Sequence, residues 1–258
     1  MTPKTILFLA ANPRNMKSLR LDEEMRDIRE ALKREHHGDR FVMERREAVR
    51  PSDLQQVIRE VQPQIVHFSG HGKGEAGLVF EDKAGRVQCI QSAALAGLFK
   101  LFSRYIECVV LNACYSEEQA EAIVAHINYT IGMNQEIGNR AAIAFSTSFY
   151  SALAAGNAIE LAYEFGLNSI QLEGIPEHLT PVLKKKPGLD ETAAQKLWAE
   201  AKPDDESKPH LGDRDAKKSS ADKSARKGNQ QTGASIQGIT ITGGDGSSFN
   251  LGNTTQNN

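Results

Sequence analysis

The stretch IVHFSGHG at residues 65–72 decides the fold, because an apolar run there breaks into a histidine flanked by glycines. A second stretch, VVLNAC at residues 109–114, repeats the pattern and ends in a cysteine. Short apolar runs of this kind are typical of strands buried inside a parallel sheet. Since the carboxyl ends of parallel strands lie along one edge of the sheet, we expect His71 and Cys114 to lie close together.

Outward from these two stretches, short apolar runs alternate with helical periodicity from Thr5 to about Pro187, which predicts an α/β domain with a mostly parallel sheet. The predicted strands are 5–11, 41–49, 65–70, 108–114, 129–133 and 181–185. The predicted helices are 21–32, 54–61, 92–103, 117–126 and 138–166. Ser18 and Ser52 are the predicted caps of the first two helices. Residues 77–90, GLVFEDKAGRVQCI, predict a β-hairpin.

The composition of the sequence changes after residue 187. Residues 199–232 carry one Leu and no Val, Ile or aromatic residue, so they bury too little apolar surface to offset the entropy of ordering. We therefore expect a globular domain at 1–187 and a disordered linker at 188–232. Residues 233–258 place Ile, Phe and Leu among Gly, Thr, Ser and Asn, which predicts a short β-prone tail able to stack with its own copies.

Charge and composition exclude several classes of partner. Lys and Arg number 31 against 33 Asp and Glu, so no basic excess indicates nucleic acid. No apolar run approaches the roughly 20 residues that span a bilayer, and no cleavable signal is recognised at the start of the sequence. The three cysteines are odd in number and lack metal-ligand spacing, which suits a reducing compartment. These features predict a cytoplasmic location.

A histidine and a cysteine at neighbouring strand ends are the groups of a nucleophilic enzyme. A thiol is mostly protonated at neutral pH, and an adjacent imidazole is its usual activator. Gly72 has no Cβ, so its N–H and that of Cys114 together form a predicted oxyanion hole. The alternative stays open that the histidine only closes a turn and the cysteine only fills the core.

Motifs for cofactors and metals do not fit this sequence. Gly72, Gly74 and Gly77 match the spacing GxGxxG, but the chain continues into GLVFED where a dinucleotide site needs a helix. The sequence also has no phosphate-binding GxxxxGK[ST] loop and no HExxH pair. It predicts no cofactor and no metal site.

The motif VHFSGHG, followed about 40 residues later by VVLNACYS, resembles the clan CD cysteine peptidases and specifically the bacterial CHAT domains, which are caspase-like domains related to separase. The similarity covers roughly residues 4–187 and includes GLVFED and LNACYSEEQAEAI. It implies a caspase-like three-layer α/β/α sandwich. It also implies a cysteine endopeptidase acting on protein or peptide substrates, with His71 as general base and Cys114 as nucleophile.

One position departs from the pattern of relatives that cut after basic residues, such as the metacaspases, which carry an acid two positions before the nucleophile. Asn112 occupies that position here and is the candidate substrate-binding residue. A neutral amide cannot supply the countercharge for Arg or Lys in the same way. Glu75, Asp82 and Glu117 are alternative acids, and the preferred residue before the cleaved bond stays open.

The segment 233–258 resembles the short amyloid-signalling motifs that end cell-death effectors of prokaryotes and fungi. That resemblance implies self-assembly, a nucleotide-binding receptor with a matching tail as partner, and a role in bacterial defence or regulated cell death. Two alternatives remain: a tail that is only a disordered end, and a non-catalytic caspase-like interaction module that assembles through the tail.

Overall fold

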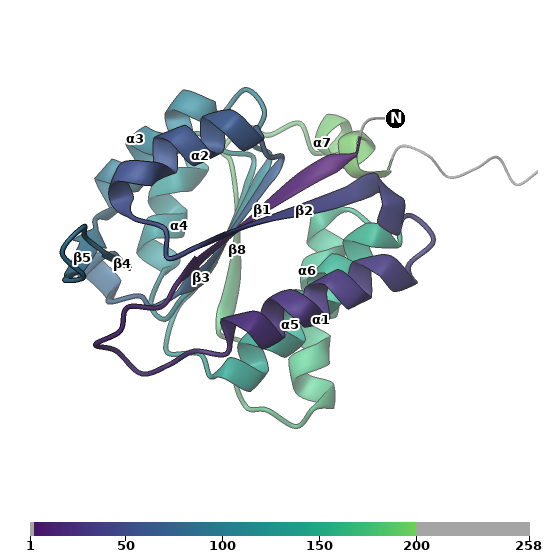
Figure 1. The fold of residues 1–258 in the computed structure, drawn as a ribbon. Coiled ribbons are helices and arrows are strands. Elements are labelled where there is room, and N and C mark those ends of the chain that lie inside the picture. The colour runs from purple at the N-terminus through teal and green to yellow at the C-terminus, as the bar shows by residue number, and fades with distance from the viewer. Residues whose placement is uncertain (1–2, 200–258) are drawn as a thin grey trace, which may run out of the picture. The chain divides into compact units, whose positions relative to one another are not determined.

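The structure is a computed structural model that describes residues 3–199 (Figure 1). The strands are β1 (Lys4–Ala11), β2 (Phe41–Glu47), β3 (Ile65–Gly70), β4 (Leu78–Glu81), β5 (Val87–Ile90), β6 (Cys108–Asn112), β7 (Tyr129–Met133) and β8 (Pro181–Lys185). The helices are α1 (Leu21–Arg34), α2 (Leu54–Val61), α3 (Ser92–Phe102), α4 (Glu117–Val124), α5 (Asn139–Ala154), α6 (Ile159–Leu172) and α7 (Glu191–Ala199). Short 3-10 turns lie at Gly38–Arg40, Pro51–Asp53 and Gly74–Ala76. None of these described helices is long and apolar enough to cross a bilayer.

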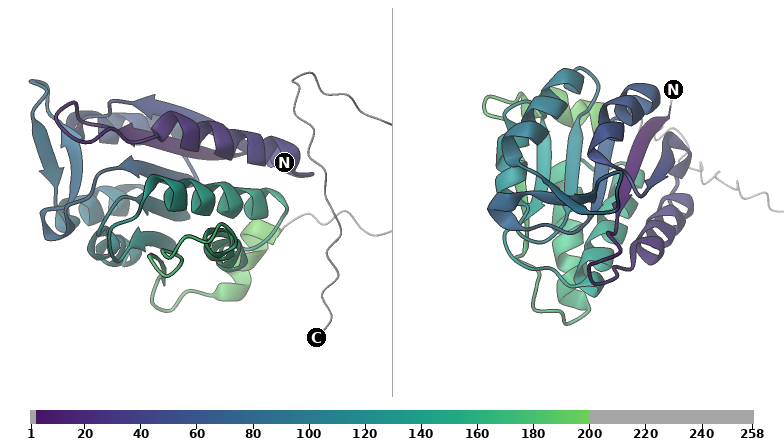
Figure 2. Two further views of the ribbon diagram at one scale, coloured as in Figure 1. Left: turned by 90° about the horizontal axis from the view of Figure 1, so that it is seen from below. Right: turned by 60° about the vertical axis from the view of Figure 1, so that its left-hand side comes forward.

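Six strands form one sheet in the order β2-β1-β3-β6-β7-β8. All neighbours in it are parallel except β7 and β8, which confirms the mostly parallel sheet. β4 and β5 pair with each other as an antiparallel hairpin, which lies beyond one end of the sheet (Figure 2). Two strands are shorter than predicted, because β2 ends at Glu47 and β6 at Asn112.

Helices cover both faces of the sheet and make two separate cores, with α2, α3 and α4 on one face and α1, α5 and α6 on the other (Figure 1). The two-residue period of a strand explains the division. Along β1, Ile6 and Phe8 belong to the core under α1 and α5, whereas Leu7 and Leu9 belong to the core under α2 and α3. The predicted three-layer α/β/α sandwich is therefore confirmed.

The single helix predicted at 138–166 is wrong, because the structure has two helices there, α5 and α6. Gly156 lies just past the end of α5 with φ +90°, a left-handed conformation that glycine adopts without strain. Its N–H donates to the Leu153 carbonyl, and the N–H of Asn157 donates to the Ala152 carbonyl. Bonds of this kind satisfy the last carbonyls of α5 and end the helix.

Neither predicted helix cap is seen. α1 begins at Leu21 after Arg20, which makes no side-chain cap, and the Ser18 hydroxyl instead accepts a hydrogen bond from Asn12 at 3.5 Å. Ser52 lies inside the 3-10 turn that precedes α2, where its hydroxyl donates to Asp53. The first turn of α1 is acidic, which stabilises the positive end of the helix dipole.

The predicted domain end at residue 187 is too early. Helix α7 lies inside the stretch expected to be linker, and its Ala194 and Trp198 are buried in the core shared with α1 and α5. The Lys4 ammonium lies 4.4 Å from the centre of the Trp198 ring, and Arg40 donates to the Trp198 carbonyl. The remainder of the predicted linker and the tail at 233–258 lie outside the described residues.

Candidate functional site

The carboxyl ends of β3 and β6 position the predicted site. These strands are parallel neighbours, and Ser69 pairs with Asn112 at their ends. His71 and Cys114 each follow two residues beyond that pair, and both line one narrow cavity of about 30 Å³. The structure therefore brings the two predicted residues to the same place, with Asn112 in the wall of the same cavity.

Gly72 packs directly against the backbone of Cys114. A Cβ at residue 72 would lie 2.0 Å from the Cys114 carbonyl oxygen, so only glycine fits at this approach. Gly72 also forms a bridge with Leu78, but its two hydrogen bonds run from Val79 N–H to His71 O and from Lys73 N–H to Gly77 O. Among the described residues, neither Gly72 N–H nor Cys114 N–H donates to another residue.

The imidazole of His71 is oriented by a backbone carbonyl. Its Nε2 lies 2.9 Å from the carbonyl oxygen of Lys17, in the loop between β1 and α1. Because a carbonyl only accepts, Nε2 carries the hydrogen and Nδ1 is the basic nitrogen of the neutral ring. Partial burial lowers the pKa of His71, and Lys73 acts in the same direction, so the ring is neutral near pH 7.

The Cys114 side chain is half-buried and rests as a thiol. Its Sγ donates to the Ile137 carbonyl at 3.8 Å. Burial raises the pKa of Cys114, and the carboxylates of Glu136 and Glu177 raise it further. The sequence predicts an imidazole that activates this sulfur, and the pKa directions on both groups favour a neutral thiol and a neutral imidazole over a thiolate–imidazolium pair.

The other two cysteines lie away from this cavity. Cys108 is fully buried in β6, where burial raises its pKa. Cys89 lies on β5 beside a wider hollow of about 830 Å³ between α2 and α3, which none of the predicted site residues lines. The larger hollow and the predicted chemistry are therefore in different places, and the arrangement of reactive groups favours the narrow cavity.

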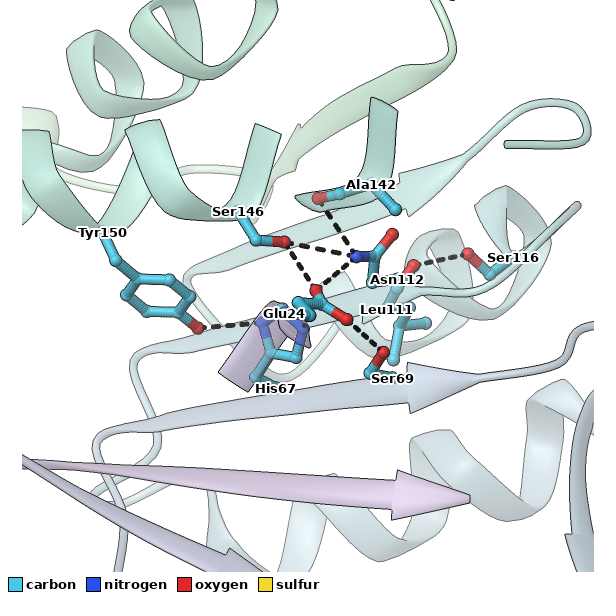
Figure 3. A network of polar contacts seen from close by, with 9 residues as sticks. All are labelled: Glu24, His67, Ser69, Leu111, Asn112, Ser116, Ala142, Ser146 and Tyr150. Atoms are coloured by element: carbon cyan, nitrogen blue, oxygen red, sulfur yellow. Dashed lines mark hydrogen bonds and ion pairs between the residues drawn. The ribbon is translucent and has the colours of Figure 1, made fainter. Parts of the chain in front are cut away.

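A buried polar network lies beneath the cavity, and sequence reasoning missed its centre, Glu24 of α1 (Figure 3). The carboxylate of Glu24 is 3% exposed. It accepts hydrogen bonds from the Ser69 hydroxyl at 2.5 Å, the Asn112 amide at 2.6 Å, the Ser146 hydroxyl at 2.8 Å and His67 Nε2 at 3.1 Å.

A signal for Glu24 was present in the sequence. It lies between Leu21, Met25 and Ile28, on the apolar stripe that α1 turns toward the sheet. An acid on that stripe must either be neutral or find donors, since burial of an unpaired charge is costly. Burial does favour the neutral form, but the hydrogen bond and electrostatic attraction to His67, together with the hydrogen bonds from Ser69 and Ser146, outweigh it and hold the pKa of Glu24 below its usual value.

His67 is buried between aromatic rings and the Glu24 carboxylate. Its ring stacks on Phe8, and Nδ1 lies 3.1 Å from the Tyr150 hydroxyl. Burial raises the pKa of Tyr150 well above its ordinary value, so the hydroxyl keeps its proton. Because a carboxylate only accepts, His67 Nε2 carries a hydrogen and donates it to Glu24. The carboxylate keeps its negative charge.

The three acids considered from sequence do not line the cavity. Glu117 pairs with Lys184 at 2.8 Å, Asp82 pairs with Arg86 at 2.8 Å, and Glu75 is exposed in a 3-10 turn. Among the described residues, no group of His, Cys, Asp and Glu is placed to hold a metal ion.

Curated relatives match part of this chain and only a small part of their own length. A protein named "Probable protease" from Gillisia limnaea is 28% identical over 168 residues, which cover 63% of this chain and 29% of that relative. A protein named "Roc-COR-CHAT protease" from an unknown prokaryotic organism is 24% identical over 183 residues, which cover 67% of this chain and 17% of that relative.

Among solved structures, the Arg-specific cysteine proteinase gingipain R resembles the chain with a TM-score of 0.52 at 12% identity, over 72% of this chain and 46% of that one. At this identity the likeness concerns the fold alone, and it confirms the caspase-like α/β/α sandwich. Residues 2–164, well over half of the sequence, match the family model described as "CHAT domain". This chain belongs to the CHAT domain family.

Proposed function

We propose that the chain is a cysteine endopeptidase of the CHAT type that cleaves protein substrates with a His71–Cys114 dyad. One observation carries the proposal: His71 and Cys114 line one cavity, with Gly72 packed on the Cys114 backbone. Relatives named as proteases support the reaction class.

The reaction begins with both groups uncharged. As Cys114 Sγ attacks the carbonyl carbon of the scissile peptide bond, its proton passes to His71 Nδ1. Nε2–H stays bonded to the Lys17 carbonyl, which holds the ring in place and stabilises the imidazolium that forms. The carbonyl oxygen becomes an oxyanion, and the N–H groups of Gly72 and Cys114 are its donors.

The second half of the reaction reverses the proton movement. Nδ1–H of His71 protonates the leaving amine as the C–N bond breaks, which leaves a thioester on Cys114. A water molecule then attacks the thioester while Nδ1 accepts its proton. The released acid and the restored thiol complete the cycle with no cofactor.

The rival function is a non-catalytic interaction module with the same fold. The narrowness of the cavity favours it, because about 30 Å³ holds roughly one water and no peptide side chain. The presence of both reactive groups and of two unengaged N–H donors favours the enzyme. Catalysis then requires the walls of the cavity to move when substrate binds.

The wider role is also a proposal. We propose that the protease acts in the cytoplasm in bacterial defence or regulated cell death, and that residues 233–258 join it to copies of itself or to a receptor with a matching tail. The composition of that segment supports assembly. The name of the Roc-COR-CHAT relative supports a CHAT protease that works beside other domains.

The proposed function is tested by cleavage of a complex peptide mixture. The full chain is incubated with peptides from a digested bacterial proteome, at low and high chain concentration, and new amino termini are identified by mass spectrometry. We expect Cys114→Ala and His71→Ala to abolish the new termini, while Cys89→Ala keeps them. Cleavage that survives Cys114→Ala, or no cleavage at any concentration, contradicts the proposal.

A further inference from the structure

We propose that the outer edge of β5 and the groove beside it are a docking site for an extended segment of a partner protein, in which apolar residues are followed by an acidic residue. β5 is the outer strand of the β4–β5 hairpin, which lies beyond one end of the sheet (Figure 2). Neither His71 nor Cys114 lines the groove. The site is therefore separate from the proposed reaction, and binding to it can be tested without activity.

The hydrogen bonds of β4 show which backbone groups of β5 point outward. Val79 of β4 donates its N–H to the His71 carbonyl at 2.9 Å, on the side of β4 away from β5. Bonded and non-bonded pairs alternate in an antiparallel ladder, and Val79 lies opposite Cys89. Cys89 is therefore in a non-bonded pair, as is Val87 two residues before it. The N–H and carbonyl groups of both residues point away from β4, along the outer edge.

These four backbone groups are open to an added strand. Among the described strands β5 pairs with β4 alone, and nothing in residues 3–199 bonds to the backbone N–H or carbonyl of Val87 or Cys89. The Val87 side chain is exposed, and Cys89 is half-buried. An open edge of this kind takes up an extended segment through main-chain hydrogen bonds, while pockets beside it select the side chains.

A groove follows the open edge. The hollow of about 830 Å³ between α2 and α3 is lined on one side by residues 88–90 of β5. A second hollow, of about 360 Å³, is lined by Arg86 and Gln88. Pro51 and Ser52 line both hollows, so the two are continuous along β5. Both volumes fall in the range of roughly 300–1,000 Å³ that is typical of ligand sites.

One end of the groove is apolar. Leu54 of α2 and Ala94 and Leu98 of α3 line it, beside Ile90 at the end of β5. No charged residue of the described chain lines the larger hollow. Apolar side chains of an added strand would leave water here, which favours binding.

The other end of the groove is basic. Arg50, Lys83 and Arg86 line the smaller hollow with a single acid, Asp82. Asp82 pairs with Arg86 at 2.8 Å, and within residues 3–199 neither Arg50 nor Lys83 forms an ion pair. Two positive charges there attract a carboxylate. Since β5 runs from its basic to its apolar end, an antiparallel segment places its apolar residues first and its acid after them.

Peptide display tests the site. A phage-displayed library of random heptapeptides is selected on the full-length Cys114→Ala chain, and we expect enrichment of β-branched or aromatic residues followed by Asp or Glu. The selected peptide and its reversed sequence are then compared by fluorescence anisotropy. The reversed peptide should bind at least roughly tenfold more weakly, because its charge meets the apolar end. No enrichment, or equal affinity of the two peptides, overturns the proposal.

The acid of the peptide and the basic end of the groove are tested together. Replacing the acid by its amide should weaken binding about threefold, as expected for an exposed ion pair. Lys83→Glu should remove this difference between the acidic and the amide peptide. An affinity that is the same with acid and amide in the wild-type groove contradicts the assigned chemistry of the partner.

A proline on β5 tests the main-chain bonds. Cys89→Pro removes the outward N–H and leaves the bonds to β4, since proline is tolerated where the N–H of an edge strand faces solvent. It should weaken binding at least roughly tenfold, whereas Cys89→Ala, the matched control, keeps the N–H and the affinity. Thermal unfolding shows which variants are folded at the assay temperature. Unchanged binding to folded Cys89→Pro overturns the proposal.

A second pair of variants keeps the test valid if the proline unfolds the hairpin. Ala94→Glu places a charge at the apolar end, and Ala93→Glu, an exposed neighbour on α3 outside the groove, is its control. The first should weaken binding at least roughly tenfold and the second should not. Equal affinities overturn the proposal. Sedimentation that falls to monomer in Cys89→Pro, with no peptide bound by the wild-type groove, would assign the edge to a second copy instead.

Discussion

Cys114 and His71 have pKa shifts that keep both groups uncharged at neutral pH. Burial and nearby carboxylates raise the pKa of the thiol, and burial with Lys73 lowers that of the imidazole. In the absence of substrate, the neutral thiol and imidazole are therefore favoured over the thiolate–imidazolium pair. For the proposed peptidase, the reaction would start from an uncharged dyad.

Alkylation tests the resting state of Cys114. At pH 7.5 we expect its reaction with iodoacetamide to be slower in the folded chain than in urea, because the thiolate fraction is lower. The folded rate should keep rising above pH 9, and His71→Ala should change it by less than about twofold. Mass spectrometry of the Cys114 peptide gives the rate. A plateau below pH 8 that His71→Ala removes would reveal a stored ion pair.

Gly72 is the residue at which the backbone allows no side chain. Gly72→Ala places a Cβ against the Cys114 carbonyl, so the loop must shift, and we expect activity to be lost with a stability cost of about 1–3 kcal/mol. Gly97→Ala is the control, since no atom lies within 4 Å of a Cβ in this helical position. It should leave activity intact and stabilise by about 0.5–1 kcal/mol. Equal denaturation midpoints for the two variants would contradict the packing argument.

Four elements meet at one carboxylate. Glu24 joins α1 to β3 through Ser69 and His67, to β6 through Asn112 and to α5 through Ser146. Two of these four elements are the strands that carry the site, β3 and β6, and the other two are helices that cover it, α1 and α5. The network thus fixes the depth at which α1 and α5 sit on the sheet, and with it the floor of the cavity.

The pH dependence of stability reports on this network. The pKa of Glu24 is lowered by folding, so its stabilisation is present above the unfolded value of about 4.3 and is lost as pH falls through the folded value. We expect Glu24→Gln to destabilise by about 1–3 kcal/mol at pH 7 and progressively less below pH 4. Urea unfolding from pH 7 to 3 measures the difference. Glu23→Gln serves as the control, and a difference independent of pH would refute the assignment of charge to Glu24.

The whole described unit includes more chain than its composition indicates. α7 returns to the core, in which its Ala194 and Trp198 are buried. Such a short anchor is easily overlooked in a stretch rich in charge. The compact unit that contains it includes the described residues 3–199.

Removing the anchor should destabilise the unit. Trp198→Ala is expected to cost about 3–5 kcal/mol, because a buried aromatic ring is replaced by a cavity. A chain ending at 187 should unfold at a lower temperature than one ending at 207. Leu172→Ala, which changes an exposed leucine of α6, should stay within about 0.5 kcal/mol. Equal midpoints for the chains ending at 187 and 207 would return the boundary to residue 187.

Assembly is the property of the whole chain that the tail predicts. The full chain should sediment as oligomers or fibres with a repeat of ~4.7 Å, while a chain ending at 232 stays monomeric. Ile239→Asp should also prevent assembly, because it places a charge in the stacked interface. Sedimentation and fibre diffraction provide the measurements. Identical sedimentation of all three chains would leave residues 233–258 without an assembly role.

The fold class could be read from the sequence, because strand and helix periodicities are local. The runs at 65–70 and 108–112 are mostly apolar and are buried along their whole length, as strands covered on both faces are, and helical patterns occupy other intervals of the chain. The shared edge of parallel strands also predicted that His71 and Cys114 meet. The break between α5 and α6 was missed, since the helical pattern continues through residues whose left-handed turn depends on Gly156 alone.

Only the tertiary structure decided what surrounds the two reactive groups. Lys17 reaches His71, and Glu24 reaches Asn112, across 54 and 88 residues of sequence, and no periodicity within one segment reports contacts between segments. The same holds for Trp198 beside Lys4. These contacts arise when helices pack onto the sheet. This packing places Glu24, an acid on the apolar stripe of α1, in the lining of the cavity at the ends of β3 and β6. Sequence alone thus determined the fold and the strand ends at which His71 and Cys114 lie. Packing decided that the Glu24 carboxylate lies in the same cavity.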